Sequence, residues 1–184
     1  MKKKLLSFLL LGVLLLNMCA CTDDVQSEYS GHRAFFRYPM VQQTPELRTA
    51  LNDPGMFCAI TFPPNYYRFT DINGRFTQMN RTSLEAYGKP VFISGFLVGT
   101  PILPDMSGRV QPVAYDLVCP NCYVESFIER ALSFKTTTEM QCGRCGRVYD
   151  LSNNGIVKSE GGGRPLFRYR MTYSATQGVL VISN

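Results

Sequence analysis

Two CxxC pairs constrain the fold of this chain more than any other feature of its sequence. The first pair is Cys119 and Cys122 in CPNC, the second is Cys142 and Cys145 in CGRC, and nineteen residues separate the two. A CxxC turn can aim two thiolates at one ion, so two such turns can complete a tetrahedral set of ligands. The sequence therefore predicts a metal site formed by these four cysteines.

The two turns are not expected to be equally regular. Pro120 fixes a backbone torsion inside the first pair, but Tyr123 occupies the position after it where a glycine would be expected. Gly143 eases the bend inside the second pair, and Gly146 after it can adopt the positive φ that such turns usually need. The second turn should therefore match a metal-binding knuckle more closely than the first.

Disulfides are the alternative use of these cysteines, either within each pair or across the two turns. Secreted chains commonly use cysteine in this way. A disulfide within CxxC closes a very small ring, which stabilises little and is easily reduced. The doubled spacing therefore favours a metal over disulfides.

The first twenty residues have the features of a secretory signal. Lys2, Lys3 and Lys4 precede an apolar run over residues 5–16, which is too short to span a bilayer. Cys21, preceded by a small alanine, resembles the lipidated cysteine of bacterial lipoproteins, and the acidic stretch after it resembles the export tag of Bacteroides-type surface lipoproteins. We therefore expect cleavage after residue 20 and lipidation of Cys21. The acyl chains would attach the protein to the bacterial outer membrane, on its periplasmic or outer face. The alternatives are a plain secreted protein and an uncleaved anchor.

The remaining chain is expected to be a tether over residues 21–33 and a single domain over residues 34–184. Without the three signal lysines, the basic excess falls from five to two, and the arginines are scattered along the chain. A nucleic-acid partner is therefore not expected. The partners expected are the membrane, through the lipid anchor, and a protein that the sequence does not identify.

Hydrolase activity is not expected from the sequence; a redox-active chain would be an electron carrier or an oxidoreductase subunit. His32 is the only histidine and lies in the expected tether, so hydrolases that need a histidine in a packed site are excluded. The glycines of SEGGGRP lack the lysine and the strand-to-helix context of a phosphate-binding loop.

Short apolar runs predict a mainly β fold. They are rich in Phe, Tyr, Val and Ile and are separated by Pro, Gly and Asn turns, which is typical of a sandwich or a barrel. The runs cover residues 34–41, 56–62, 66–70, 74–80, 89–99, 113–118, 164–173 and 178–184. One short helix is expected to start at Thr44 as its N-cap and to stop before Pro54. Cys58, inside a predicted strand, is expected to be a small buried apolar residue.

The second half of the chain resembles a Rieske domain. The family pattern has a cysteine, a glycine, a Tyr-Asp pair, a glycine turn and an Arg-Pro-Leu strand. The matching residues are Cys142, Gly146, Tyr149, Asp150, Gly155, Arg164, Pro165 and Leu166, and a strand containing Asp116 leads to Cys119. The resemblance covers residues 90–184 and implies stacked antiparallel sheets, with a rubredoxin-like or zinc-ribbon-like metal-binding region over residues 116–150.

The ligand positions depart from this family. Rieske domains bind two irons with two cysteines and two histidines. Here Asn121 and Cys145 stand where the histidines belong, Cys122 is an additional cysteine, and Arg147 replaces a serine. The usual Rieske cluster therefore cannot form on this chain.

Zinc is the expected occupant, with a single rubredoxin-like iron or a 2Fe-2S cluster as alternatives. Paired CxxC turns aim their sulfurs at one centre, which favours a single ion. The signal lacks a twin arginine, so a chain exported unfolded would acquire its metal outside the cytoplasm, and zinc needs no assembly machinery. Closed zinc sites are structural. We therefore expect a lipid-anchored binding or scaffold module; the alternative is an electron-transfer protein, with Ile102 and Leu103 flanking its site.

Overall fold

Three central strands, buried on both faces, organise the protein. The computed structural model describes residues 27–105 and 107–184. Every residue of β5 (Phe96–Gly99) and β6 (Val113–Asp116) is buried, as are the first four residues of β2 (Phe57–Thr61). A strand that is apolar along its whole length needs a hydrophobic layer on each side. The fold therefore has two such layers, one on each face of these strands.

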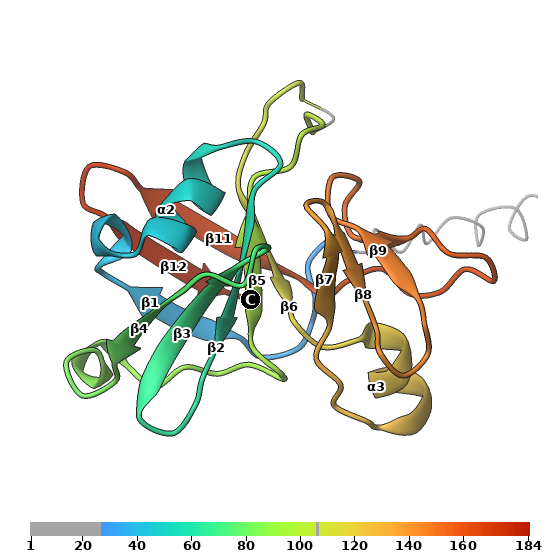
Figure 1. Ribbon diagram of the computed structural model, residues 1–184, viewed down its shortest axis with the longest axis horizontal. Coiled ribbons are helices and arrows are strands. Elements are labelled where there is room, and N and C mark those ends of the chain that lie inside the picture. Colours follow the sequence, from blue (N-terminus) through green and yellow to red (C-terminus); the bar gives the residue numbers. More distant parts are fainter. Residues whose placement is uncertain (1–26, 106) are drawn as a thin grey trace, which may run out of the picture.

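The central strands belong to an eight-stranded antiparallel sheet that curls into a half-barrel (Figure 1). Its order is β1-β12-β11-β6-β5-β2-β3-β4. The other strands are β1 (Phe35–Tyr38), β3 (Tyr66–Asp71), β4 (Phe76–Asn80), β11 (Arg168–Ser174) and β12 (Val179–Ser183). The register places Cys58 opposite Val98, and Val98 opposite Ala114. This row of small and branched side chains faces the inside of the half-barrel.

A helix and a cluster of aromatic rings fill the inside of the half-barrel. Helix α2 (Pro45–Asn52) lies over β2, β3 and β5 and buries Leu47, Ala50 and Leu51. Phe36 on β1 packs against Tyr67 and Phe96, with ring centroids 5.5 and 5.8 Å apart. Single turns of 3₁₀ helix over Val41–Gln43 and Glu85–Tyr87 complete the connections. The inner layer is therefore a closed hydrophobic core.

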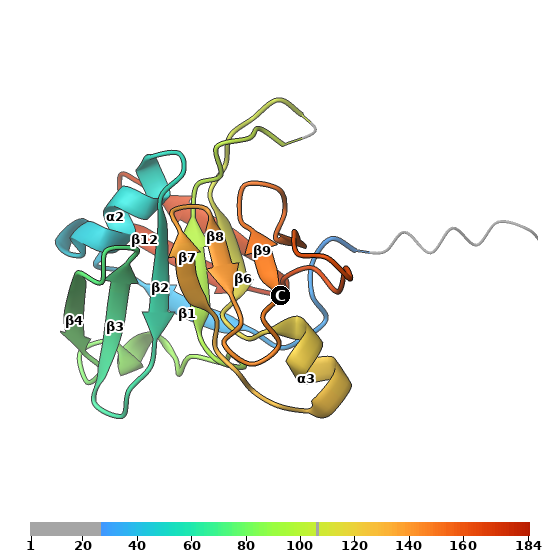
Figure 2. The same cartoon turned by 45° about the vertical axis from the view of Figure 1, so that its right-hand side comes forward.

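A second, four-stranded sheet covers the outer face of the central strands (Figure 2). Its order is β10-β9-β8-β7. The strands are β7 (Ser133–Thr136), β8 (Glu139–Gln141), β9 (Val148–Asp150) and β10 (Ile156–Val157), and helix α3 (Pro120–Ser126) lies beside them. The layer between the two sheets contains Phe57, Leu97, Val113, Tyr115, Leu117, Leu132, Met140, Tyr149, Leu151 and Leu166. Three of the four CxxC cysteines, Cys119, Cys122 and Cys142, are buried in this same layer.

The predicted mainly β architecture with two antiparallel sheets is confirmed. Each predicted run contains a strand. Strands β7 to β9 and α3 were not predicted, because residues 116–150 were interpreted as metal-binding loops, and β10, with two residues, lies outside the predicted runs. The predicted helix forms as α2, although Thr44 does not cap it with its side chain. The Thr44 hydroxyl instead bonds to the Tyr38 hydroxyl and donates to the Met40 carbonyl.

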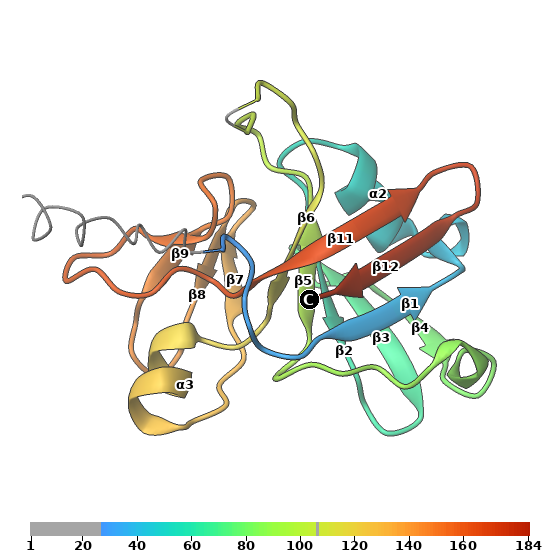
Figure 3. The ribbon, with the colours of Figure 1, turned by 180° about the vertical axis from the view of Figure 1, so that it is seen from behind.

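The predicted signal peptide and Cys21 lie outside the described residues. The described end of the expected tether contacts the domain, because the Ser30 amide donates to the Arg168 carbonyl over 2.7 Å. Figure 3 shows this segment running along the boundary between the large sheet and the part of the molecule that contains α3. No helix in the described ranges has the length and apolar character needed to cross a bilayer.

Candidate metal centre

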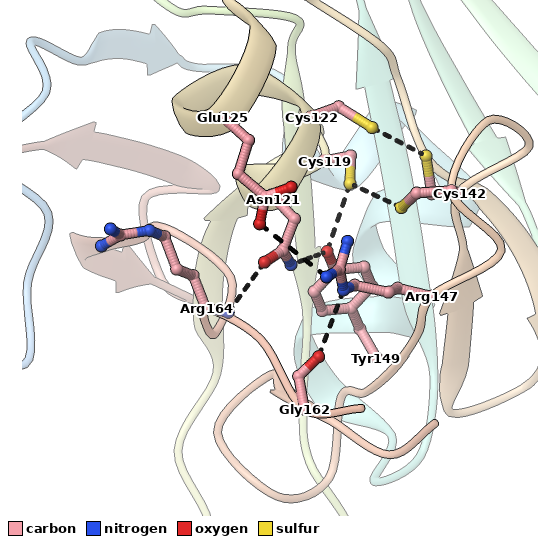
Figure 4. Close-up of polar contacts among 10 residues, drawn as sticks. Cys119, Asn121, Cys122, Glu125, Cys142, Arg147, Tyr149, Gly162 and Arg164 are labelled. Atoms are coloured by element: carbon pink, nitrogen blue, oxygen red, sulfur yellow. Dashed lines mark hydrogen bonds and ion pairs between the residues drawn. The ribbon is translucent and has the colours of Figure 1, made fainter. Parts of the chain in front are cut away.

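The structure brings the sulfurs of the two CxxC pairs together. The Sγ atoms of Cys119, Cys122, Cys142 and Cys145 all lie within 4.8 Å of one another. Cys119 Sγ is 3.7 Å from Cys145 Sγ, and Cys122 Sγ is 3.7 Å from Cys142 Sγ. Figure 4 shows the Cys122 to Cys142 approach across the space between α3 and the β8–β9 turn. A disulfide would need about 2.05 Å, so the four thiols are free and arranged to bind a metal ion.

The first pair lies at the start of a helix and not in a short turn. Cys119 occupies the N-cap position of α3, and Pro120 occupies the first helical turn, where a missing amide proton costs nothing. The Tyr123 amide bonds to the Cys119 carbonyl over 3.0 Å. Because the chain continues into a helix, no glycine is needed at Tyr123, which explains the irregularity seen in the sequence. The positive φ comes later, at Phe127, where the helix ends.

The second pair forms the predicted knuckle between β8 and β9. The Gly146 amide bonds to the Cys142 carbonyl over 3.0 Å, and Gly146 has the expected positive φ of 73°. The Arg144 amide points at Cys142 Sγ over 3.4 Å. An amide directed at sulfur favours the thiolate, which is the form that binds a metal.

The four thiols differ in exposure and in acidity. Cys119, Cys122 and Cys142 are buried, whereas Cys145 is partly exposed. Burial raises the pKa of Cys122 far above its usual value, and the neighbouring thiols add to the rise. Burial also acts to raise the pKa of Cys145, but hydrogen bonds from the Arg147 backbone and guanidinium help to lower it to about 7. A cation among the four sulfurs would stabilise their thiolate forms.

A buried tyrosine on β9 contacts the first CxxC pair. The Tyr149 hydroxyl lies 3.2 Å from Cys119 Sγ and accepts a hydrogen bond of 2.8 Å from Asn121 Nδ2, so its own proton points to the sulfur (Figure 4). Burial raises the pKa of Tyr149, and the Cys119 thiol adds to this, so the hydroxyl stays protonated and can donate. Asn121, which stands at a histidine position of the Rieske pattern, thus holds Tyr149 and has no free nitrogen aimed at the sulfurs.

The glycine-rich loop of residues 158–164 closes over Asn121. The Arg164 amide donates to Asn121 Oδ1 over 3.1 Å, and the Arg147 Nε donates to the Gly162 carbonyl over 3.1 Å (Figure 4). A Cβ atom at Gly163 would lie 2.8 Å from the Asn121 side chain. A glycine there allows the backbone to approach this closely. The loop predicted from SEGGGRP therefore packs against Asn121, the residue between Pro120 and Cys122.

A buried carboxylate fixes the approach of β6 to Cys119. Asp116 Oδ1 accepts hydrogen bonds from the Ser94 and Val118 amides, at 3.2 and 2.8 Å. Its Oδ2 accepts from the Ile93 amide at 3.0 Å and from the Tyr169 hydroxyl at 3.2 Å. Burial raises the pKa of Asp116, and these four hydrogen bonds act in the opposite direction. The sequence shows Asp116 only as part of a strand, because three of its four partners are 22 to 53 positions away along the chain.

Two sequence features lie away from the four sulfurs. Ile102 and Leu103 are exposed in the loop between β5 and β6, which joins β6 at the end opposite to Cys119 and projects away from α3 (Figure 1). The Ile102 amide points to Ser152 and the loop lies at the other end of β6 from the sulfurs. The hypothesis that Ile102 and Leu103 flank the site is therefore wrong.

His32 packs against Tyr123 and Phe167, with ring centroids 5.4 and 4.5 Å apart, and is not in the four-cysteine group.

No protein-family model, curated protein or solved structure matches this chain. The resemblance to Rieske domains therefore stays a prediction. The fold and the site define a class: a mainly β protein in which four clustered cysteines, three of them buried between two antiparallel sheets, are arranged to bind a metal ion.

Proposed function

We propose that this chain is a lipid-anchored, extracytoplasmic, Rieske-like protein whose four cysteines bind one structural zinc ion. The spacing of the sulfurs carries the proposal. In a tetrahedral site with metal–sulfur bonds of about 2.3 Å, neighbouring sulfurs lie about 3.8 Å apart. The two closest Sγ pairs are 3.7 Å apart, and no pair within the group exceeds 4.8 Å. The four sulfurs therefore fit around one ion with little movement.

A two-iron cluster fits this spacing less well. A 2Fe-2S cluster divides its four ligands between two irons, so its ligand sulfurs spread over a longer distance than those around one ion. The limit of 4.8 Å on every pair of sulfurs leaves little room for that spread. One ion is therefore the better occupant.

Zinc in this position would join α3 to the β8–β9 knuckle, in addition to the hydrogen bonds of Tyr149. Cys119 and Cys122 belong to α3, whereas Cys142 and Cys145 belong to the β8–β9 knuckle. A site closed by four thiolates has no open coordination position for a substrate, so its contribution is folding free energy. The proposed role is a scaffold or binding module held at the membrane through Cys21.

Metal analysis of soluble protein comprising residues 22–184 tests the proposal. We expect about one zinc per chain and no absorption in the visible range, because zinc has a filled d shell. Iron together with a visible charge-transfer band would favour electron transfer instead. Sulfurs found joined as disulfides by mass spectrometry would contradict both functions.

Electron transfer by a single iron is the second candidate, and the Tyr149 hydroxyl favours it. Tetrahedral sites of four thiolates accept iron as well as zinc. Hydrogen bonds to the ligand sulfurs set the reduction potential of such centres, because they stabilise the reduced, more negative state. The Tyr149 hydroxyl, 3.2 Å from Cys119 Sγ, is placed for this role.

Replacing Tyr149 by phenylalanine should lower the reduction potential of the iron-loaded protein, measured by voltammetry. The variant loses the hydrogen bond to Cys119 Sγ and keeps the ring. Tyr115→Phe is a matched control, because Tyr115 is also buried between the sheets and its hydroxyl has no hydrogen-bond partner among the described residues. Equal shifts in both variants would mean that the Tyr149 hydroxyl does not tune the centre.

A further inference from the structure

Phe127 has two features that packing does not explain. Its side chain is 88% exposed, the highest value among the exposed large apolar residues of the described chain. Its backbone has a φ of 54°, in the left-handed region that bulky residues rarely adopt. A glycine would end α3 there without strain. Position 127 therefore has an exposed aromatic residue where the positive φ favours glycine. This combination points to a functional contact of the Phe127 ring.

The end of α3 lies beside the described N-terminal segment. The His32 ring packs edge-on against Tyr123, and the Phe127 amide bonds to the Tyr123 carbonyl over 2.9 Å, one helical turn further on. Half-exposed Val124 and Ile128 extend the apolar surface around Phe127. The chain thus enters the domain on the side that carries α3, opposite to β3 and β4 (Figure 3).

The length of chain before this segment limits how far the surface can lie from a membrane. Cys21 precedes Ser27, the first described residue, by six positions. Six residues span at most about 22 Å when fully extended. If Cys21 carries acyl chains, the bilayer surface lies within that reach of Ser27, so the end of the domain with α3 stays close to the bilayer.

We infer that the end of α3 docks on the bilayer that holds the lipid anchor, with Phe127 inserted between headgroups and acyl chains. This inference rests on the proposed lipidation of Cys21. Aromatic side chains favour the membrane interface, where an apolar ring can enter while the neighbouring backbone stays hydrated. Exposed Glu129 and Arg130 follow the ring in the sequence, and Glu125 before it is paired with Arg147, so the charges near Phe127 balance, which suits zwitterionic headgroups. Because α3 has seven residues, the metal centre lies about 10 Å from its far end.

Tryptophan fluorescence can test this docking without background, because the sequence contains no tryptophan. Phe127→Trp places one fluorophore at the proposed contact. Phe76→Trp is the matched control, because Phe76 is 47% exposed on β4, at the far edge of the large sheet (Figure 1). The full lipidated chain of each variant is reconstituted into phosphatidylcholine vesicles with ordinary or with brominated acyl chains. Unchanged metal content shows that each variant is folded.

We expect F127W to emit about twofold less light in brominated than in ordinary vesicles, because interfacial groups lie about 5–10 Å into the headgroup and acyl boundary. F76W should emit equally in both. Equal emission from F127W in protein that floats with the vesicles overturns the docking and leaves the anchor standing. A blue shift of the F127W emission without quenching by bromine would mean that protein, and not lipid, covers position 127. That result would also overturn the docking. A chain that does not float contradicts the anchor and the docking together, whatever metal it binds.

Discussion

Cys142→Ser should abolish metal binding and strongly lower the melting temperature of the protein. Cys142 is fully buried, and its Sγ lies 3.7 Å from Cys122 Sγ. A serine hydroxyl is a harder and far less acidic ligand than a thiol, so it binds zinc poorly. Structural zinc contributes on the order of 10 kcal/mol to the folding of small zinc peptides, and whole domains are stable by only about 5–15 kcal/mol. We expect metal content near zero and a melting temperature lower by at least about 10 °C, measured by metal analysis and circular dichroism.

Cys58→Ala separates this effect from the loss of any buried thiol. Cys58 is equally buried, but it lies on β2 and faces the other hydrophobic layer. This variant should keep its metal and melt only slightly lower, by the cost of a small cavity. Treating the unaltered protein with a zinc chelator should reproduce the low melting temperature of C142S. Metal loss from C142S without a change in melting temperature would show that the ion is not structural.

The sequence predicts the large sheet well because its signals are local. The runs that form β2, β5 and β6 are apolar at consecutive positions, and this indicates strands covered on both faces. The spacing of the cysteines likewise predicts which four side chains meet, because each CxxC pair brings two sulfurs together over a few residues. Features that depend on adjacent residues can therefore be predicted from the sequence.

The rest of the site depends on contacts between distant residues, which leave little local signal. Asp116 and Tyr169 are 53 positions apart, and Cys119 and Tyr149 are 30 positions apart. Helix α3 was missed because it has only seven residues and ends at Phe127, without the glycine that usually marks a helix end. The strands β9 and β10 are two or three residues long and form because the metal-binding region packs on the central strands. Tertiary packing decides these elements.

Asn121, inside the first CxxC pair, has a structural role. Its carbonyl oxygen accepts from the Arg164 amide, and its amide nitrogen donates to the Tyr149 hydroxyl. Both ends of the side chain are therefore occupied, and the sulfur of Cys122, one residue later, joins the four-cysteine group. Asn121 is therefore not available as a metal ligand, and the four thiols supply the proposed single-ion site.

Asp116→Asn should destabilise both the large sheet and the metal centre. The carboxylate accepts two hydrogen bonds on each oxygen, and all four donors, from Ile93, Ser94, Val118 and Tyr169, are partly or fully buried. An amide of the same shape turns one oxygen into a donor. The Tyr169 hydroxyl can rotate and accept from it, but the Ile93 amide then loses its acceptor. We expect a loss of about 2–3 kcal/mol in the free energy of unfolding, measured by urea denaturation.

The position of Asp116 makes metal affinity a second measurement. Its bond to the Val118 amide fixes the backbone that leads into Cys119, so D116N should also release zinc at a lower chelator concentration. Asp53→Asn is the matched control, because Asp53 is exposed at the end of α2, and such a change should alter stability by less than about 0.5 kcal/mol. Tyr169→Phe removes one of the four donors and should lie between the two variants. A D116N protein as stable as D53N would mean that the four hydrogen bonds do not hold the approach to the metal centre.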